Sequence, residues 1–109
     1  MKIKLATSVV GLALAASSAS YAAGYPENTI TMIVPFAAGG PTDTIARLLA
    51  QAMGTNLKQQ IIVEDVGGAG GTLGAARVAR AAPDGYTIFF HHVGHATAPS
   101  LYRKLPYNS

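Results

Sequence analysis

The sequence predicts an α/β fold in which a parallel, open sheet forms in the chain order β-α-β-α-β. Two observations support this class. Short apolar runs alternate with amphipathic runs, and the connections after the first two apolar runs are short and rich in glycine. Strands that alternate with helices over such short connections pair in parallel through right-handed crossovers. Ligands of open α/β sheets bind outside the carboxyl ends of the strands, so a site is expected there.

Three segments have the composition of strands. Ile30–Val34 is a nearly continuous apolar run that ends at Pro35, as expected for a strand buried on both faces. Residues 61–63 form a second apolar run. Residues 86–91 follow a tight Pro-Asp-Gly turn at 83–85 and form the third strand.

The first helix is predicted to begin at Gly40 and to end at Gly54. Gly40 serves as the N-cap, Pro41 fits the first helical position, and Asp43 places a carboxylate at the third. Large apolar residues recur at helical spacing and predict an amphipathic helix. These residues are Ile45, Leu48, Leu49 and Ala52.

The second helix is predicted over residues 73–82, where Pro83 ends it. Residues 91–99, HHVGHATAP, are expected to form a third loop at the carboxyl edge of the sheet. The remaining tail predicts one short turn, with no further strand or capping helix. Because parallel sheets are normally covered on both faces, we expect the chain to be part of a longer protein.

The amino-terminal residues 1–22 have the pattern of a cleaved secretory signal peptide. Lys2 and Lys4 precede an uncharged apolar core at 5–16, and Ser20 and Ala22 supply the small residues before a cleavage site after Ala22. The core is shorter than the roughly 20 residues that cross a bilayer, so no membrane span is expected after cleavage. The sequence therefore predicts export to the periplasm or the cell exterior.

The mature segment carries little net charge. Without Lys2 and Lys4, the 8 basic residues fall to 6 against 5 acidic residues, so the formal charge drops from +3 to +1. Basic residues do not cluster, which argues against a nucleic-acid partner and against electrostatic membrane binding. The chain has no cysteine, so disulfide and thiolate chemistry are absent.

Two glycine-rich turns are the strongest candidates for a site. Residues 35–43, PFAAGGPTD, and 66–71, VGGAGG, each lie between a strand and a helix. Backbone amides and helix N-termini at such turns bind anions. Because neither turn contains Lys or Arg, amides and the hydroxyls of Thr42, Thr44 or Thr72 would hold the anion, which suits a carboxylate better than a polyphosphate. The alternative is that the glycines only permit tight turns.

Other chemistries find less support. The second turn fails the spacing of a dinucleotide fingerprint, and both turns lack the Gly-Lys-Ser/Thr ending of a P-loop. His91, His92 and His95 suggest a metal or a ligand contact, but no acidic residue or cysteine lies beside them in sequence. Asp43 is either a general base or, more commonly at this helical position, an acceptor for loop amides. We expect no catalytic residue, no cofactor and no metal.

The sequence resembles the substrate-binding proteins of tripartite tricarboxylate transporters, the Bug or TctC type. The resemblance runs from Tyr25 to Tyr107. It includes ATAPSLYRKLPY and is most specific in IVPFAAGGPTD with Ala46-Arg47, in GGAGG and in PDGYT. It implies a type II periplasmic-binding-protein fold, of which residues 23–109 form part of the N-terminal lobe. It also implies a periplasmic receptor that binds a small organic acid, such as a di- or tricarboxylate, for the membrane subunits of the transporter.

The resemblance assigns ligand contacts to the first two loops, and His95 is added from the third. The implied residues are Phe36, Ala37, Ala38, Gly39, Gly40, Thr42, Asp43, Ala69, Gly70, Gly71, Thr72 and His95.

Members of the family are longer, so the chain is expected to be a truncated amino-terminal portion that lacks the second lobe. The alternatives are an exported α/β enzyme fragment, dependent on a nucleotide or a metal, and a non-functional relic of a receptor.

Overall fold

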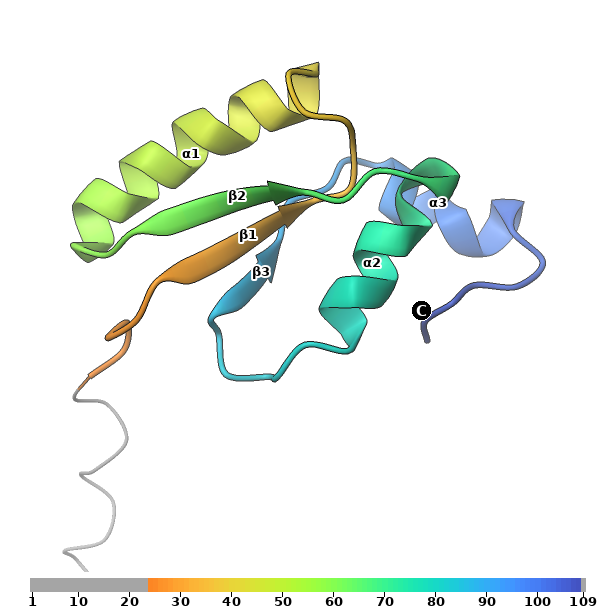
Figure 1. Ribbon diagram of the computed structural model, residues 1–109. Helices are drawn as coiled ribbons and strands as arrows, with labels where there is room; N and C mark the ends of the chain where they lie inside the picture. The colour runs from red at the N-terminus through yellow and green to blue at the C-terminus, as the bar shows by residue number, and fades with distance from the viewer. Residues whose placement is uncertain (1–23, 109) are drawn as a thin grey trace, which may run out of the picture.

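The computed structural model describes residues 24–108, which form a three-stranded parallel sheet with helices on both of its faces (Figure 1). The predicted α/β fold is confirmed, whereas the predicted signal peptide, residues 1–22, lies outside the described residues. In chain order the elements are β1 (Ile30–Val34), α1 (Pro41–Leu57), β2 (Ile61–Asp65), the single 3-10 turn η1 (Ala69–Gly71), α2 (Thr72–Ala79), β3 (Thr87–Phe89) and α3 (Gly94–Leu101). No helix between residues 24 and 108 is long and apolar enough to cross a bilayer.

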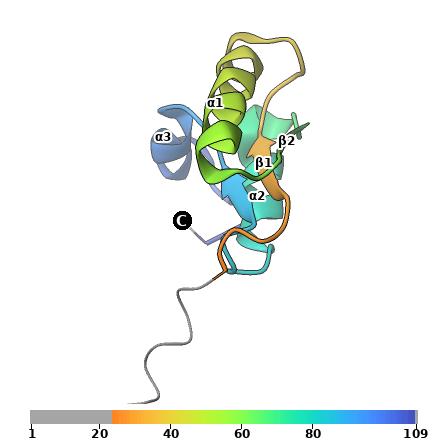
Figure 2. The same ribbon diagram turned by 90° about the vertical axis from the view of Figure 1, so that its left-hand side faces the viewer.

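The strands lie in the order β2-β1-β3, and every pair is parallel. In the register Met32 lies between Val63 of β2 and Ile88 of β3. The chain thus passes from β1 to β2 on one side of it, and then crosses over β1 to form β3 on the other side. Because both crossovers are right-handed, α1 and α2 cover opposite faces, as Figure 2 shows. The direction reverses between β1 and β3, which makes their carboxyl ends the topological switch point where ligands of such sheets bind.

The core is centred on β1. Ile30, Met32, Ile33 and Val34 are almost fully buried, so the prediction of a strand buried on both faces is confirmed. On the α1 face, partly buried apolar residues complete the cluster that forms around Met32, Val34, Ala46 and Ala50. These residues are Phe36, Met53, Ile61, Val63, Ile88 and Phe90.

The start of α1 is as predicted, but the face that it buries is different. Gly40 is the N-cap and Pro41 the first helical residue. Ala46 and Ala50 face the sheet, whereas Ile45 and Leu48 are 56% and 64% exposed. The expectation that the large apolar residues form the packed stripe is therefore wrong. The small alanine side chains let the helix axis lie close to the strands.

The other helix boundaries also differ from the prediction. Helix α1 continues past Gly54, which packs so close to the backbone that an added methyl would lie 3.0 Å from the Gln59 oxygen. The turn at Lys58 ends it in a left-handed conformation. Helix α2 begins one residue earlier than predicted and ends at Ala79, three residues before the predicted end at Ala82.

The third strand forms as predicted but is shorter, and the tail differs from the prediction. Strand β3 pairs with β1 only over Thr87–Phe89, shorter than the predicted 86–91. Residues 94–101, predicted to lie in a loop and a turn, form α3 with Pro99 inside the helix. Pro99 lacks the amide proton that would continue the hydrogen-bond ladder, which is why the pattern did not indicate a helix.

Gly74 permits a close approach between α2 and the end of β1. A methyl group at this position would lie 2.7 Å from Cβ and 3.0 Å from Cα of buried Pro35. We expect Gly74→Ala to lower the free energy of unfolding by about 1–3 kcal/mol, because the backbone must move to accept the methyl. Urea unfolding followed by circular dichroism measures this loss.

The control is Gly67→Ala. There the added methyl meets Phe36 at an ordinary contact distance of 3.5 Å, and φ is not positive. This variant should unfold at the urea concentration of the parent chain or slightly above it. Equal midpoints for the two variants would contradict the packing argument.

Candidate functional site

The two glycine-rich turns meet at the carboxyl end of β1. The first glycine loop, residues 35–40, joins β1 to α1, and the second glycine loop, residues 66–71, joins β2 to α2 (Figure 1). A methyl on Gly67 would lie 3.5 Å from the carbonyl carbon of Phe36, so the backbones of the two loops are in near contact. The prediction that both loops lie at one edge of the sheet is confirmed.

The first glycine loop delivers the N-terminus of a long helix. Gly39 has a φ of 81°, and the Gly40 amide donates to the Ala37 carbonyl at 3.3 Å. No side chain caps α1, and the structure shows no acceptor within residues 24–108 for the amides of Thr42 and Asp43. Free amides and the positive end of the helix dipole therefore coincide, which is the geometry that attracts an anion.

Asp43 holds the first loop in shape. Its Oδ2 accepts the Gly39 amide at 2.7 Å, and its Oδ1 lies 2.8 Å from Nε of Arg47. The predicted role as an acceptor for loop amides is confirmed. The Gly39 bond, and then the Arg47 guanidinium, hold the pKa of Asp43 below its usual value. A buried carboxylate so engaged is a poor general base, and it positions the loop rather than touching an anion.

Arg47 links this carboxylate to the end of β2. Its Nη2 lies 2.9 Å from Oδ2 of Asp65, while Nε pairs with Asp43. Burial, followed by the charge of Asp43, raises the pKa of Asp65, although Arg47 opposes both effects. One guanidinium therefore offsets the repulsion between two acidic groups and ties α1 to β2 beside the loops.

The second glycine loop is a run of left-handed residues. Ala69, Gly70 and Gly71 have φ angles of 46°, 61° and 91°. Ala69 is a non-glycine residue in this region, a conformation that occurs where the surrounding structure imposes it. The Thr72 hydroxyl donates to the Ala69 carbonyl at 2.9 Å and closes the loop. Among residues 24–108, the amides of Ala69 and Gly70 show no protein acceptor.

The third segment brings imidazoles to the same place. His91 lies two residues after the end of β3, and its ring centroid lies 5.1 Å from that of Phe36 in the first glycine loop. His95, in the first turn of α3, lies 5.3 Å from His91 and stacks on Tyr107 at 5.7 Å. The structure thus places His95 at the outer side of the cluster and His91 nearer the loops.

Of the residues assigned to ligand contacts by sequence, those of the two loops lie together, whereas His95 contacts His91, Phe89 and Tyr107 rather than the loops. Thr72 and Thr44 donate their hydroxyl protons to carbonyls of their own loops, at 2.9 and 3.0 Å. His91 and Tyr102, which the assignment left out, also lie here. A methyl on Gly71 would touch His91, and a methyl on Gly70 would touch the hydroxyl of Tyr102. His91 was one of the three histidines singled out in the sequence, but only the strand order brings it to the loops, and Tyr102 carried no local signal because the unexpected α3 places it there.

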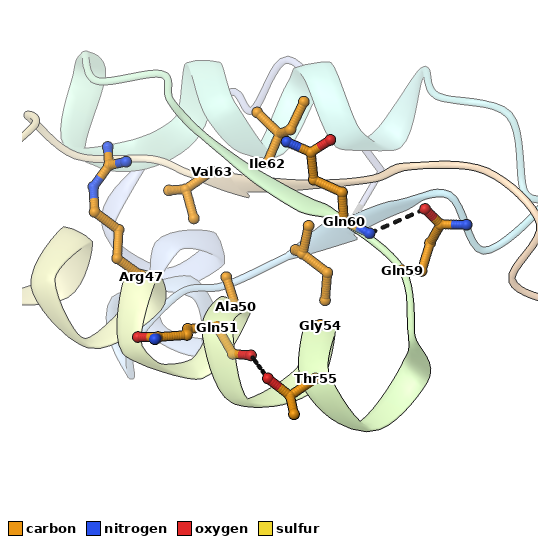
Figure 3. Close-up of a pocket in the computed structure, with 10 residues that line it drawn as sticks. Arg47, Ala50, Gln51, Gly54, Thr55, Gln59, Gln60, Ile62 and Val63 are labelled. Atoms are coloured by element: carbon orange, nitrogen blue, oxygen red, sulfur yellow. Dashed lines mark hydrogen bonds between the residues drawn. The ribbon is translucent and has the colours of Figure 1, made fainter.

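A separate surface groove of about 670 Å³ runs between α1 and the outer edge of β2 (Figure 3). Gln51 and Thr55 of α1 face Gln60 and Ile62 across it. It lies along the strand rather than at the carboxyl ends, and its polar groups are mostly amides that do not converge on one point. We do not assign the site to it. Residues 24–108 also contain no group of three or more His, Cys, Asp or Glu placed to hold a metal ion.

Comparison with known proteins agrees with this geometry. Residues 45–109 match the receptor family of tripartite tricarboxylate transporters, TctC. A UPF0065 protein of Agrobacterium vitis is 57% identical over 83 residues, which are 76% of this chain and 24% of that protein. The chain therefore belongs to the TctC family, and it spans about a quarter of the length of this curated relative.

Solved structures give the same result. The periplasmic binding protein BugD is 56% identical with a TM-score of 0.74, and the match covers 77% of this chain and 28% of that one. MatC from Rhodopseudomonas palustris, solved with bound malate, is 52% identical with a TM-score of 0.72 and matches over 77% and 29%. The chain thus has the fold of the corresponding part of periplasmic binding proteins.

Replacing Asp43 by asparagine tests its hold on the first glycine loop. Asp43→Asn keeps the shape of the side chain but removes its negative charge. The hydrogen bond from the Gly39 amide is weakened as a result, and the ion pair with Arg47 is lost. We expect faster hydrogen exchange at the Gly39 amide, measured by NMR. The control Glu64→Gln breaks the exposed ion pair with Arg77, away from both loops, and should leave Gly39 unchanged. Unaltered exchange in Asp43→Asn would show that other contacts fix the loop.

His91 should make stability depend on pH below its ordinary pKa of 6.5. Burial, then the charges of His92 and His95, lower its pKa in the folded chain, so the unfolded chain binds the proton first. The contribution of neutral His91 to the free energy of unfolding is present above pH 6.5. It is lost as the pH falls from 6.5 through the lowered pKa of the folded chain. Urea unfolding across this range should show a steeper loss in the parent than in His91→Phe. Parallel pH profiles would contradict this.

Proposed function

We propose that this chain supplies two arms of a carboxylate site in a periplasmic receptor of a tripartite tricarboxylate transporter. The observation that supports it most is the meeting of two cation-free glycine loops at the switch point of the sheet, each followed by a helix N-terminus. The free amides of Thr42, Asp43, Ala69 and Gly70 supply short-range donors for carboxylate oxygens.

The ligand is a small organic acid with at least two carboxylates. A site built from neutral amides suits the modest charge of a carboxylate better than that of a polyphosphate. The malate in the related MatC structure, 52% identical to this chain, is of the same chemical class. We therefore take malate as the first probe.

The proposal extends to the domain organisation and the cellular location. Residues 1–22 act as a cleaved signal peptide, and residues 23–109 form part of the N-terminal lobe, consistent with similarity to periplasmic binding proteins. The receptor delivers its ligand to the membrane subunits of the transporter. It is a binding protein and not an enzyme, in keeping with the structural role of the buried Asp43 carboxylate beside the first glycine loop.

Malate titrations followed by amide NMR test the site. Malate should shift the amides of both glycine loops, and Gly71→Val should weaken binding by about tenfold or more, equivalent to about 1.4 kcal/mol. Gly71 has a φ of 91°, which a β-branched residue does not adopt without strain. Thr42→Val introduces no such backbone strain and tests whether the Thr42 hydroxyl, in the first turn of α1, contributes to binding. It should weaken malate binding less than Gly71→Val does.

The matched control for Gly71→Val is Ala79→Val, which introduces the same side chain at the exposed end of α2. Its affinity for malate should equal that of the parent, and circular dichroism should show both variants folded. Malate shifts that spare both loops, or a folded Gly71→Val with parental affinity, would refute the loop assignment. An absence of binding by the parent would refute the receptor proposal for this chain.

A further inference from the structure

His91 lies just beyond the carboxyl end of β3, at the switch point of the β2-β1-β3 order, and this place between the carboxyl ends of β1 and β3 is called the crevice below. Phe36 of the first glycine loop lies beside it, with its ring centroid 5.1 Å from that of His91. The Phe90 amide still donates to the Ile33 carbonyl at 3.0 Å, so β1 holds the backbone up to the residue before His91. A side chain placed at this point faces any ligand that binds between the strands.

The hydrogen bonds of the ring define which nitrogen is free. Nδ1 of His91 accepts the His92 amide at 2.7 Å, closer than its 3.0 Å approach to the His92 carbonyl oxygen. A neutral imidazole that accepts at Nδ1 carries its proton on Nε2. We therefore assign Nε2–H as the free donor of this ring.

That donor faces the second glycine loop. A methyl on Gly71 would lie 2.8 Å from Nε2 of His91 and 3.4 Å from Cβ of Pro35. Gly71 is the N-cap of α2, so Nε2–H lies beside the first amides of that helix. The absence of a side chain at Gly71 lets the imidazole approach the backbone closely here, and an added methyl would displace the ring.

Aromatic packing holds the ring in this orientation. The edges of Phe36 and Phe89 meet it at centroid distances of 5.1 and 5.2 Å, with interplanar angles of 79° and 76°. Both contacts are of the edge-to-face type that fixes ring orientation. The titratable groups beside it are His92, at 4.9 Å between centroids, and His95, at 5.3 Å.

We propose that His91 is a third arm of the carboxylate site, a side-chain donor whose Nε2–H binds a ligand oxygen held beside the Gly71 end of α2. This inference rests on the proposed function and deepens it. The glycine loops supply donors that any carboxylate satisfies, whereas a fixed imidazole selects ligands that place an acceptor in the crevice between β1 and β3. A dicarboxylate with a hydroxyl or carboxylate oxygen at this point is preferred over a monocarboxylate.

The test uses the whole chain, selectively labelled with nitrogen-15 in histidine, and malate as the probe. In the free protein the nitrogen shifts of His91 should report a protonated Nε2. Malate should move the Nε2 and its proton and slow the exchange of that proton. His91→Phe keeps the aromatic packing without the donor and should weaken malate binding by about tenfold or more, since it removes a hydrogen bond to a charged group.

Three comparisons separate the inference from the proposed function. His91→Gln restores a donor and should recover part of the affinity, which a purely structural role for the ring would not produce. His92→Phe is the control, because His92 is exposed and stacks on Phe36, and its Nδ1 accepts the Gly94 amide at 2.9 Å instead of facing the second glycine loop. Propionate, with one carboxylate, should bind the parent and His91→Phe with equal affinity.

If the parent binds malate and folded His91→Phe binds it with the same affinity, this inference is overturned. The proposed function would then still stand. Loop amides that shift with malate while the His91 nitrogens stay fixed would do the same. A parent chain that binds no malate would overturn both, because no carboxylate would then occupy the crevice.

Discussion

The arrangement at the carboxyl edge of the sheet depends on the carboxylate of Asp43. It is buried, it accepts the Gly39 amide, and through Arg47 it is joined to Asp65 at the end of β2. A buried carboxylate is tolerated only where hydrogen bonds and a cation compensate for lost hydration. The loop, the helix and the neighbouring strand must therefore keep their positions for this charge to remain satisfied, and the free amides of α1 are held in place as a result.

The sequence predicts well those features that depend on residues near one another in the chain. Gly40, Pro41 and Asp43 indicate the start of α1 because capping and the fixed φ of proline act within one turn. The nearly continuous apolar run of β1 indicates a strand buried on both faces, because an alternating pattern would be expected if one face met water. Both predictions are confirmed in the structure.

The features that the sequence does not predict depend on contacts between distant segments. Periodicity predicts a helix that ends at Gly54, but it does not say which face is buried. Helix α1 carries both a small apolar face and a large one, and the alanines face the sheet because they permit a closer approach. Helix α3 contains Pro99, which local propensity reads as a break, whereas Tyr102 at its end lies against the second glycine loop. His91 and Gly71 lie 20 positions apart in the numbering, and the order of the strands alone brings them together.

The absence of Lys and Arg from both glycine loops has a consequence for ionic strength. A carboxylate held by amide dipoles interacts with groups whose fields decay within a few ångströms, whereas attraction by a surface cation extends over a Debye length of about 8–10 Å near physiological salt and weakens as salt rises. Retention of the ligand at such a site therefore changes little between dilute and saline surroundings. The same construction gives no long-range attraction to draw the ligand in, so selectivity rests on the fit of its oxygens rather than on its total charge.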